Sequence, residues 1–519
     1  MSATRREFLQ AMAGSASFGL AQFASFRDLV AGGLDDPAPA EDIVRFGPDI
    51  EPIVRLIEVT PREKCVAMLV EQLRRGLPYR RFLAAAFYAG IRKLNSNHVV
   101  YMISSLHEAT LDLRPELRLL PLFWAVDVFK KQQESFPSPP LPALRGALPS
   151  PERAASELAD AMQRADIDGV ERAFVALARS RGARQAVEEL WPFGCQNGGA
   201  GGHGAIALAS CARALEAIGG LDAETALRFA ARHVFTLGGD GKSDAYFPLN
   251  KARVDKHAGT LPAGWAGGPA DQAATRELFG LMREGKTEPA CDLAVSQLLA
   301  GGTAQSIWDA VHLTTAELMV RHNDGWGLAS RPLHSNTSIN ALHHAFRTLV
   351  FPQTRLLVLL QAVAWAADKT NSELRAGTLR DIEITRLPNA ETPPTAQEAI
   401  REVFSLVPLR YYDWLPAKGA ELRYGERSAA DEACRKTFAL CSRNPGAAPL
   451  FVQEAREWQC RKSTGDSHEY KFQSAILEEA GRVSAAWQPH LLAASVHYFH
   501  GAQSLDNPAV VQAQEALHS

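Results

Sequence analysis

A pattern of apolar residues recurs four times along the chain and restricts the possible folds more than any other feature. When His98, His203, His334 and His468 are aligned, apolar residues follow without gaps at positions +24, +28 and +31 in every copy. These spacings place the residues on one face of one helix. The three columns are Leu122, Leu227, Val358 and Leu492; Val126, Ala231, Ala362 and Val496; and Phe129, Val234, Trp365 and Phe499. The period favours repeated helical units that cover one another's apolar faces.

The helix that follows each aligned histidine has its own repeated feature. Position +7 is always small and position +8 is always apolar, as in Ser105-Leu106, Ser210-Cys211, Ala341-Leu342 and Ala475-Ile476. Small residues allow another helix to approach closely. The pattern therefore predicts a small contact spot on each of these helices.

The composition agrees with a helical globular protein. The chain has 519 residues, of which 46% are hydrophobic and 22% charged, with a net charge of −3. Ala, Leu, Glu and Arg dominate and no sustained alternation of β-branched residues occurs, which favours an all-α fold. The absence of a basic excess argues against nucleic acid as a partner.

Three loop-like segments divide the chain into units. They run over Ser135–Pro151, Leu237–Asp271 and Arg386–Gln397, and each is rich in Pro or Gly. We expect one domain over 40–501, with units at about 60–134, 151–236, 271–368 and 396–501, and a C-terminal tail over 502–519. Each unit is predicted to contain a helical hairpin, a loop that ends at the histidine, and two further helices. Trp326–Leu333 is interpreted as one such loop.

The first residues are typical of an export signal. Arg5 and Arg6 precede Phe8 and a short apolar run over Ala11–Phe26. This order resembles a twin-arginine (Tat) signal peptide, which we place at 1–33. The run is too short and too polar for a stable membrane span. The prediction is a periplasmic or secreted protein that meets the Tat translocase during export.

The aligned histidines suggest a metal site. If the units are related by rotation, His98, His203, His334 and His468 lie at equivalent helix starts around one histidine-lined pocket. A neutral imidazole is well suited to hold a transition metal, and the positive end of a helix dipole favours the neutral ring. The alternative is that each histidine caps a helix or packs under a loop.

Further polar residues lie near these positions. His107 and His343 both stand nine residues after an aligned histidine, and His312 lies in a helical stretch with Asp309 and Glu317. His107, His312 and His343 are candidates for cofactor binding. The glycine-rich stretch Gly198–Gly204 could bring the backbone close to a ligand, or serve as a loop hinge.

The seven cysteines show no C-x-x-C pair and irregular spacing. They suit core positions better than a disulfide framework or a zinc site.

Three stretches resemble the motifs of questin oxidase-like proteins. They are "GHGAIALASCARAL" at His203, "LHSNTSINALHHAF" at His334 and "GDSHEYKFQSAILE" at His468. The resemblance covers roughly Glu63 to Gly501. It implies an α-helical monooxygenase of the Baeyer–Villiger type that acts on polycyclic aromatic ketones, with NADPH as a possible cofactor. By position it points to His203, His334, His468 and Lys471.

We therefore expect an exported oxidoreductase that acts on a small-molecule substrate. His203, His334 and His468 would bind iron, copper or zinc or move protons, and His98 would complete the site. Lys471 and Asn336 would stabilise developing negative charge. Two alternatives stay open: a helical-repeat scaffold that binds a protein or peptide, and a periplasmic protein that holds a metal or haem without turnover.

Overall fold

The computed structural model describes residues 43–93, 97–135, 139–198, 201–237, 243–322, 326–407, 427–463 and 468–518, without the side chains of 97–98, 237, 326–331 and 427. Within these ranges the chain forms 22 α-helices and three short 3₁₀ helices, and the only β pairing is three isolated bridges. This confirms the all-α prediction. The expected signal at 1–33 lies outside the described residues.

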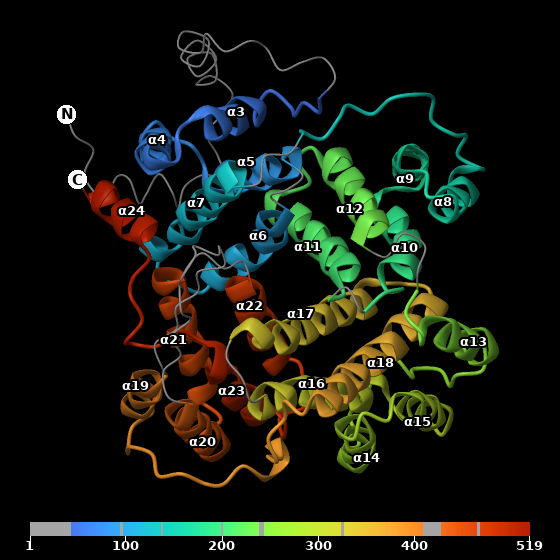
Figure 1. Cartoon of the computed structure of the whole chain (residues 1–519), viewed down its shortest axis with the longest axis vertical. Coiled ribbons are helices and arrows are strands. Elements are labelled where there is room, and N and C mark those ends of the chain that lie inside the picture. Colours follow the sequence, from blue (N-terminus) through green and yellow to red (C-terminus); the bar gives the residue numbers. More distant parts are fainter. Residues whose placement is uncertain are drawn as a thin grey trace.

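The helices are numbered in Figure 1. Their bounds are α3 Glu51–Val59, α4 Arg62–Arg74, α5 Tyr79–Arg92, α6 Asn97–Thr110, α7 Leu120–Ser135, α8 Ala154–Gln163, α9 Ile167–Arg181, α10 Ala183–Gly194, α11 His203–Ile218, α12 Ala223–Leu237, α13 Phe247–His257, α14 Gln272–Arg283, α15 Thr287–Leu299, α16 Ala304–Arg321, α17 Trp326–Thr348, α18 Pro352–Ala376, α19 Ala396–Leu406, α20 Arg427–Arg443, α21 Ala447–Lys462, α22 His468–Ala480, α23 Gln488–Ser495 and α24 Pro508–His518. The 3₁₀ helices are η3 Pro115–Leu117, η4 Ile384–Arg386 and η5 Val496–Tyr498.

Four helices form a closed ring at the centre of the molecule (Figure 1). Helix α6 packs against α11, α11 against α17, α17 against α22, and α22 returns to α6. These are the four helices that carry the aligned histidines. Each also packs against the helix that follows it in the chain: α7, α12, α18 or α23.

The repeated columns explain this packing. The paired residues at +7 and +8 are buried in all four ring helices, and so are the residues at +24, +28 and +31. In the fourth unit, however, α23 ends at Ser495, Val496 lies in η5 and Phe499 is extended. The expectation of one continuous closing helix is wrong there, although both side chains stay buried. That the four units superpose, and that a pocket lies between the histidines, stay predictions.

Two units contain a helix that the proposed unit does not include, although the stretch around His312 is itself predicted to be helical. Helix α10 lies between the α8–α9 hairpin and His203, and α16 lies between the α14–α15 hairpin and His334. A hairpin followed directly by the histidine loop is therefore found only in the first and fourth units. Almost every residue of α16 is buried, so its sequence lacks the polar face by which a surface helix is recognised.

The expected loop over Trp326–Leu333 is wrong. These residues form the start of α17, and Pro332 lies inside the helix. A proline removes one backbone hydrogen bond and costs about 3 kcal/mol in a helix interior, which the packing of a 23-residue helix against four neighbours offsets. His334 consequently sits inside α17 and not at its entrance.

Two other segments are more ordered than expected. The glycine-rich segment Leu237–Asp271 contains α13, which packs against α18 through the buried Asn250 and Val254. The expected C-terminal tail forms α24, which packs against α4 and α7 of the first unit. Helix α13 carries few apolar residues, and α24 is short, so neither gives a strong periodic signal.

Side-chain caps mark where the remaining linkers end. The Asp271 carboxylate accepts hydrogen bonds from the first amides of α14, and Thr395 accepts one from Glu398 at the start of α19. Both are the residue types that satisfy the free N–H groups of a first turn.

All seven cysteines are buried free thiols. No helix in the described ranges has the length and apolar character needed to cross a membrane.

Candidate functional site

Three of the aligned histidines lie together at one end of the ring. The Nε2 atoms of His334 and His468 are 3.0 Å apart. The ring centroids of His203 and His334 are 4.9 Å apart, and those of His334 and His468 are 4.6 Å apart. We call His203, His334 and His468 the histidine cluster. Its members come from α11, α17 and α22, so the ring brings together residues that the sequence separates by more than a hundred positions.

A capping role does not suit His334, and no side chain caps the helix that begins at His203. His334 lies eight residues into α17 and cannot cap its start. The residue before α11 is Gly202, and no side chain caps that helix end. The imidazoles meet one another instead, as metal ligands or proton-transferring groups do.

The glycine-rich stretch packs directly against the cluster. Gly201 and Gly202 have φ values of 73° and 68°. A Cβ atom on Gly201 would lie 3.1 Å from the His334 ring and 3.2 Å from the His203 ring. The stretch thus brings the backbone close to the histidines, and glycine supplies both the positive φ and the space.

Lys471 lies one turn after His468, and its Nζ atom is 5.6 Å from the centroid of the Tyr101 ring. Tyr101 in turn lies 6.4 Å from His203, centroid to centroid. Burial raises the pKa of Tyr101 well above its usual value, so the phenol keeps its proton. The Lys471 amine therefore lies over the neutral Tyr101 phenol, whose ring in turn faces His203 of the cluster.

Asn336 lies two residues after His334 in α17 and is buried. Neither its Oδ1 nor its Nδ2 atom has a hydrogen-bond partner among the described residues. An unsatisfied buried amide costs about 1–3 kcal/mol, and no hydrogen bond among the described residues offsets that cost. The role of Asn336 toward a bound molecule stays a prediction.

The structure does not unite all the predicted residues. The side chain of His98 lies outside the described residues. His107 contacts Tyr79, with 3.2 Å between its Nδ1 atom and the phenol oxygen. It therefore does not join His312 and His343, because α6 lies on a different side of the ring from α16.

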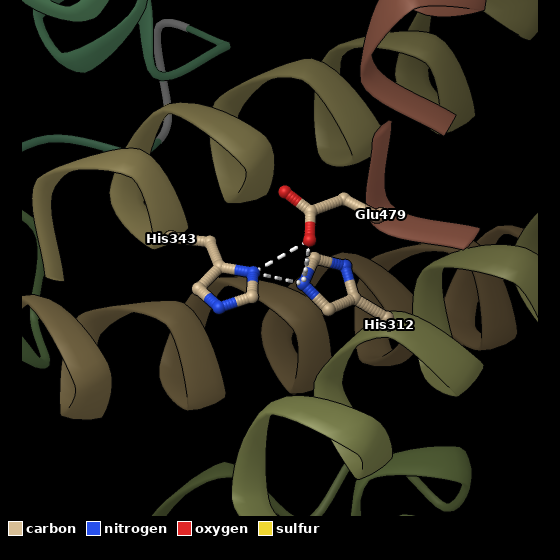
Figure 2. Close-up of side chains that lie close together, drawn as sticks. All are labelled: His312, His343 and Glu479. Atoms are coloured by element: carbon tan, nitrogen blue, oxygen red, sulfur yellow. Dashed lines mark hydrogen bonds and ion pairs between the residues drawn. The ribbon is translucent and has the colours of Figure 1, made fainter. Parts of the chain in front are cut away.

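His312 and His343 form a second centre with Glu479 (Figure 2). His312 Nε2 and His343 Nδ1 are 2.9 Å apart, and they lie 3.0 Å and 2.5 Å from the same oxygen, Oε2 of Glu479. We call these three residues the triad. They come from α16, α17 and α22 and are 1%, 5% and 0% exposed.

Neighbouring side chains fix the orientation of the triad. Asn340 donates to the other Glu479 oxygen over 2.6 Å. The indole of Trp308 stacks on His343 with the ring centroids 4.1 Å apart and the planes 14° from parallel. The carboxylate and one imidazole are therefore held in place from outside the triad.

Burial and charge set the protonation of these groups. Burial lowers the pKa of His343, against the opposite effect of Glu479. Burial acts to raise the pKa of Glu479, but His312 and His343 outweigh it and hold that pKa well below its usual range. The triad thus presents an ionised carboxylate beside a neutral imidazole.

Sequence reasoning named both triad histidines but missed the role of Glu479 and Tyr101. A signal existed for each. Glu479 stands eleven residues after His468, where the other units have the buried alanines Ala109, Ala214 and Ala345. Tyr101 and Lys471 share position +3 of the repeat, so adjacent ring helices bring them together.

The histidine cluster and the triad lie along the same pair of helices. His334 and His468 meet near one end of the α17–α22 pair, and His343 and Glu479 meet near the other. The two helices therefore run in the same direction. With a rise of 1.5 Å per residue, the two centres are about 14–16 Å apart.

The fold and these centres define an all-helical protein with a buried, histidine-rich interior. Comparison of the chain with protein-family models, curated protein sequences and solved structures finds no match. The function has to be inferred from the side chains themselves.

Proposed function

We propose that this protein is an oxidoreductase whose reaction centre is the histidine cluster, and that the cluster holds a transition-metal ion. The observation that carries the proposal is the convergence of His203, His334 and His468 from three ring helices. Local structure does not require these side chains to meet. A scaffold that binds a protein on its surface needs no such internal cluster.

The donor set fits a metal ion. Imidazole suits iron, copper and zinc, and two Nε2 atoms 3.0 Å apart can direct their lone pairs at one ion. A bound iron or copper ion would supply a centre at which molecular oxygen can be activated. His203 is placed to act as a further ligand or as a proton carrier, since its ring lies against that of His334.

The surrounding side chains suit oxygen chemistry on a carbonyl compound. The Lys471 ammonium stabilises negative charge that develops on the substrate or on oxygen. The neutral Tyr101 phenol can donate a hydrogen bond or a proton. Asn336 has an unused amide donor and acceptor with which to orient a polar group.

The substrate class in this proposal rests on the resemblance to questin oxidase-like proteins. The substrate would be an aromatic or polycyclic ketone that gains one oxygen atom and becomes an ester. The second atom of O₂ leaves as water, with NADPH supplying the two electrons. A protein that only stores a metal could carry the same ligands. Turnover therefore has to be measured separately from metal content.

Export through the Tat translocase is part of the proposal, on the basis of Arg5 and Arg6. Changing both to Lys should hold the protein in the cytoplasm. Unchanged export of the double variant would refute the signal.

The test begins with elemental analysis and an absorption spectrum of the full chain after export through its own signal. A Soret band would indicate haem, and stoichiometric iron or copper would indicate a bare metal centre. His334→Ala should then lower metal content and oxygen consumption with an aromatic ketone. His518→Ala is the control, because His518 is exposed at the end of α24. If His334→Ala matches the wild type in metal content and oxygen consumption, as the control should, the histidine cluster is not the reaction centre.

A further inference from the structure

The triad has an arrangement that hydrogen bonding alone does not explain. Three atoms, His312 Nε2, His343 Nδ1 and Glu479 Oε2, lie within 3.0 Å of one another in a closed triangle (Figure 2). A ring nitrogen carries at most one proton, and that proton lies in the ring plane. If both nitrogens donate to the carboxylate oxygen, nothing joins the two nitrogens at 2.9 Å. If one nitrogen donates its proton to the other, the accepting nitrogen has no proton to donate to the carboxylate.

A cation removes this mismatch, because all three atoms can then present lone pairs to it. The point equidistant from the three atoms is about 1.6 Å from each, so an ion just outside their plane reaches all three at the about 2.0–2.1 Å typical of zinc bound to His and Glu. Two imidazoles and one carboxylate form a known ligand set for divalent zinc and iron.

The surroundings are those of a built metal site. Asn340 holds the Glu479 oxygen that points away from the triangle, and Trp308 fixes the His343 ring. Arg482 lies 3.6 Å from the same outer oxygen and adds to its support. Metal-binding carboxylates are commonly oriented by such outer hydrogen bonds.

We propose that His312, His343 and Glu479 bind one divalent first-row transition-metal ion, and that this ion is structural and separate from the histidine cluster. The site is closed, since no triad residue is more than 5% exposed. Its ligands come from α16 and α17 in the third unit and from α22 in the fourth. The ion therefore links two units of the ring.

The test uses Co²⁺ as the probe on the metal-stripped full chain. The background is His334→Ala, which disrupts the histidine cluster and so isolates the triad. This variant should still take up one equivalent of Co²⁺, with the visible bands of a protein-bound ion and a higher melting temperature. Adding Glu479→Gln should weaken uptake about 100-fold or more, because a charged ligand is lost. Adding Glu188→Gln is the matched control and should leave uptake unchanged: Glu188 of α10 is also buried, but it accepts hydrogen bonds from the Val350 and Phe351 amides, which a Gln oxygen can still accept.

The outcomes separate this site from the proposed reaction centre. If His334→Ala binds no Co²⁺, or if Glu479→Gln binds it as tightly as the control, the triad is not a metal site. Neither result bears on metal bound to the histidine cluster, which is measured in the Glu479→Gln chain with His334 intact. Should Glu479→Gln fail to fold by circular dichroism, His343→Gln in the same background replaces it, and full uptake by that variant overturns the proposal.

Discussion

At the residue scale, the glycines beside the histidine cluster show how closely the backbone is packed there. A Cβ atom on Gly202 would clash with Ser338 of α17 and would lie 3.0 Å from the Trp365 ring. Gly202 is therefore restricted both by its positive φ and by its neighbours. Its substitution should move α11 away from α17, and with it His203 away from His334.

We predict that Gly202→Ala destabilises the protein much more than Gly220→Ala. Both glycines have a φ near +70°, so both variants should lose about 1–2 kcal/mol from the left-handed backbone. Only Gly202 has neighbours within 4 Å, which should add about 1–3 kcal/mol of overpacking. Urea unfolding of the two variants measures the difference, and equal losses would show that the close approach at Gly202 is not rigid.

A buried histidine that belongs to neither centre predicts how stability depends on pH. His490 of α23 is 8% exposed and lies against Phe438 and Trp487. Burial lowers its pKa to about 4, whereas an unfolded histidine titrates near 6.5. The unfolded chain therefore binds a proton that the folded chain does not bind between these values. The stabilisation is complete above about pH 6.5 and is lost as the pH falls toward 4.

The expected result is a flatter pH profile for His490→Gln. Between pH 7.5 and pH 5 its free energy of unfolding should fall by about 2 kcal/mol less than that of the wild type. His518→Gln is the control, because that histidine is exposed. Urea unfolding at the two pH values gives the comparison, and parallel profiles for wild type and His490→Gln would contradict the assigned burial.

At the element scale, α24 decides whether the end of the chain is a tail or part of the fold. Its buried face contains Ala509, Val510 and Ala513, which pack onto the first unit. We predict that Val510→Asp lowers the free energy of unfolding by about 3 kcal/mol or more, because a charge would enter an apolar contact. Gln512→Asp, on the exposed face of the same helix, should change it by less than about 0.5 kcal/mol. Thermal melting tests both variants. If neither changes the melting temperature, the C-terminal residues are a tail, as the sequence predicts.

Helix α17 shows where local sequence signals mislead. Gly327 and Pro332 predict a loop, and the structure continues a helix through both. Loop signals report local backbone preferences of a few kcal/mol, and packing along a long central helix exceeds them. The ring helices have such packing on several sides, so local signals are least reliable at the centre.

At the scale of the whole molecule, the four central helices α6, α11, α17 and α22 close into a ring. Helix α22 of the fourth unit packs against α6 of the first, where Ser474 donates to Glu108 over 2.9 Å. On the outside of this junction, Arg456 pairs with Asp112 at 3.0 Å. A closed ring differs from an open solenoid, in which end units can be removed while the rest stays folded.

We predict that a chain ending at residue 395 does not fold cooperatively. It lacks α22, so α6 and α17 each lose a neighbour and expose buried apolar faces to water. Circular dichroism against urea should show no sharp transition for this fragment. Adding residues 396–519 in trans should restore it. A sharp transition in the shorter fragment alone would show that the units are independent.

The sequence by itself determined the helical class, the buried columns and the helices that carry the aligned histidines. These depend on local periodicity, which each helix expresses whatever lies around it. It also led to the convergence of His203, His334 and His468, because residues in equivalent positions of a repeat meet if the repeat closes. Only the tertiary structure decided that the ring does close, that α24 completes the first unit, and that Glu479 meets His312 and His343. Those contacts join α16, α17 and α22 across unit boundaries, and the pairing of distant surfaces depends on how whole helices pack rather than on any local pattern.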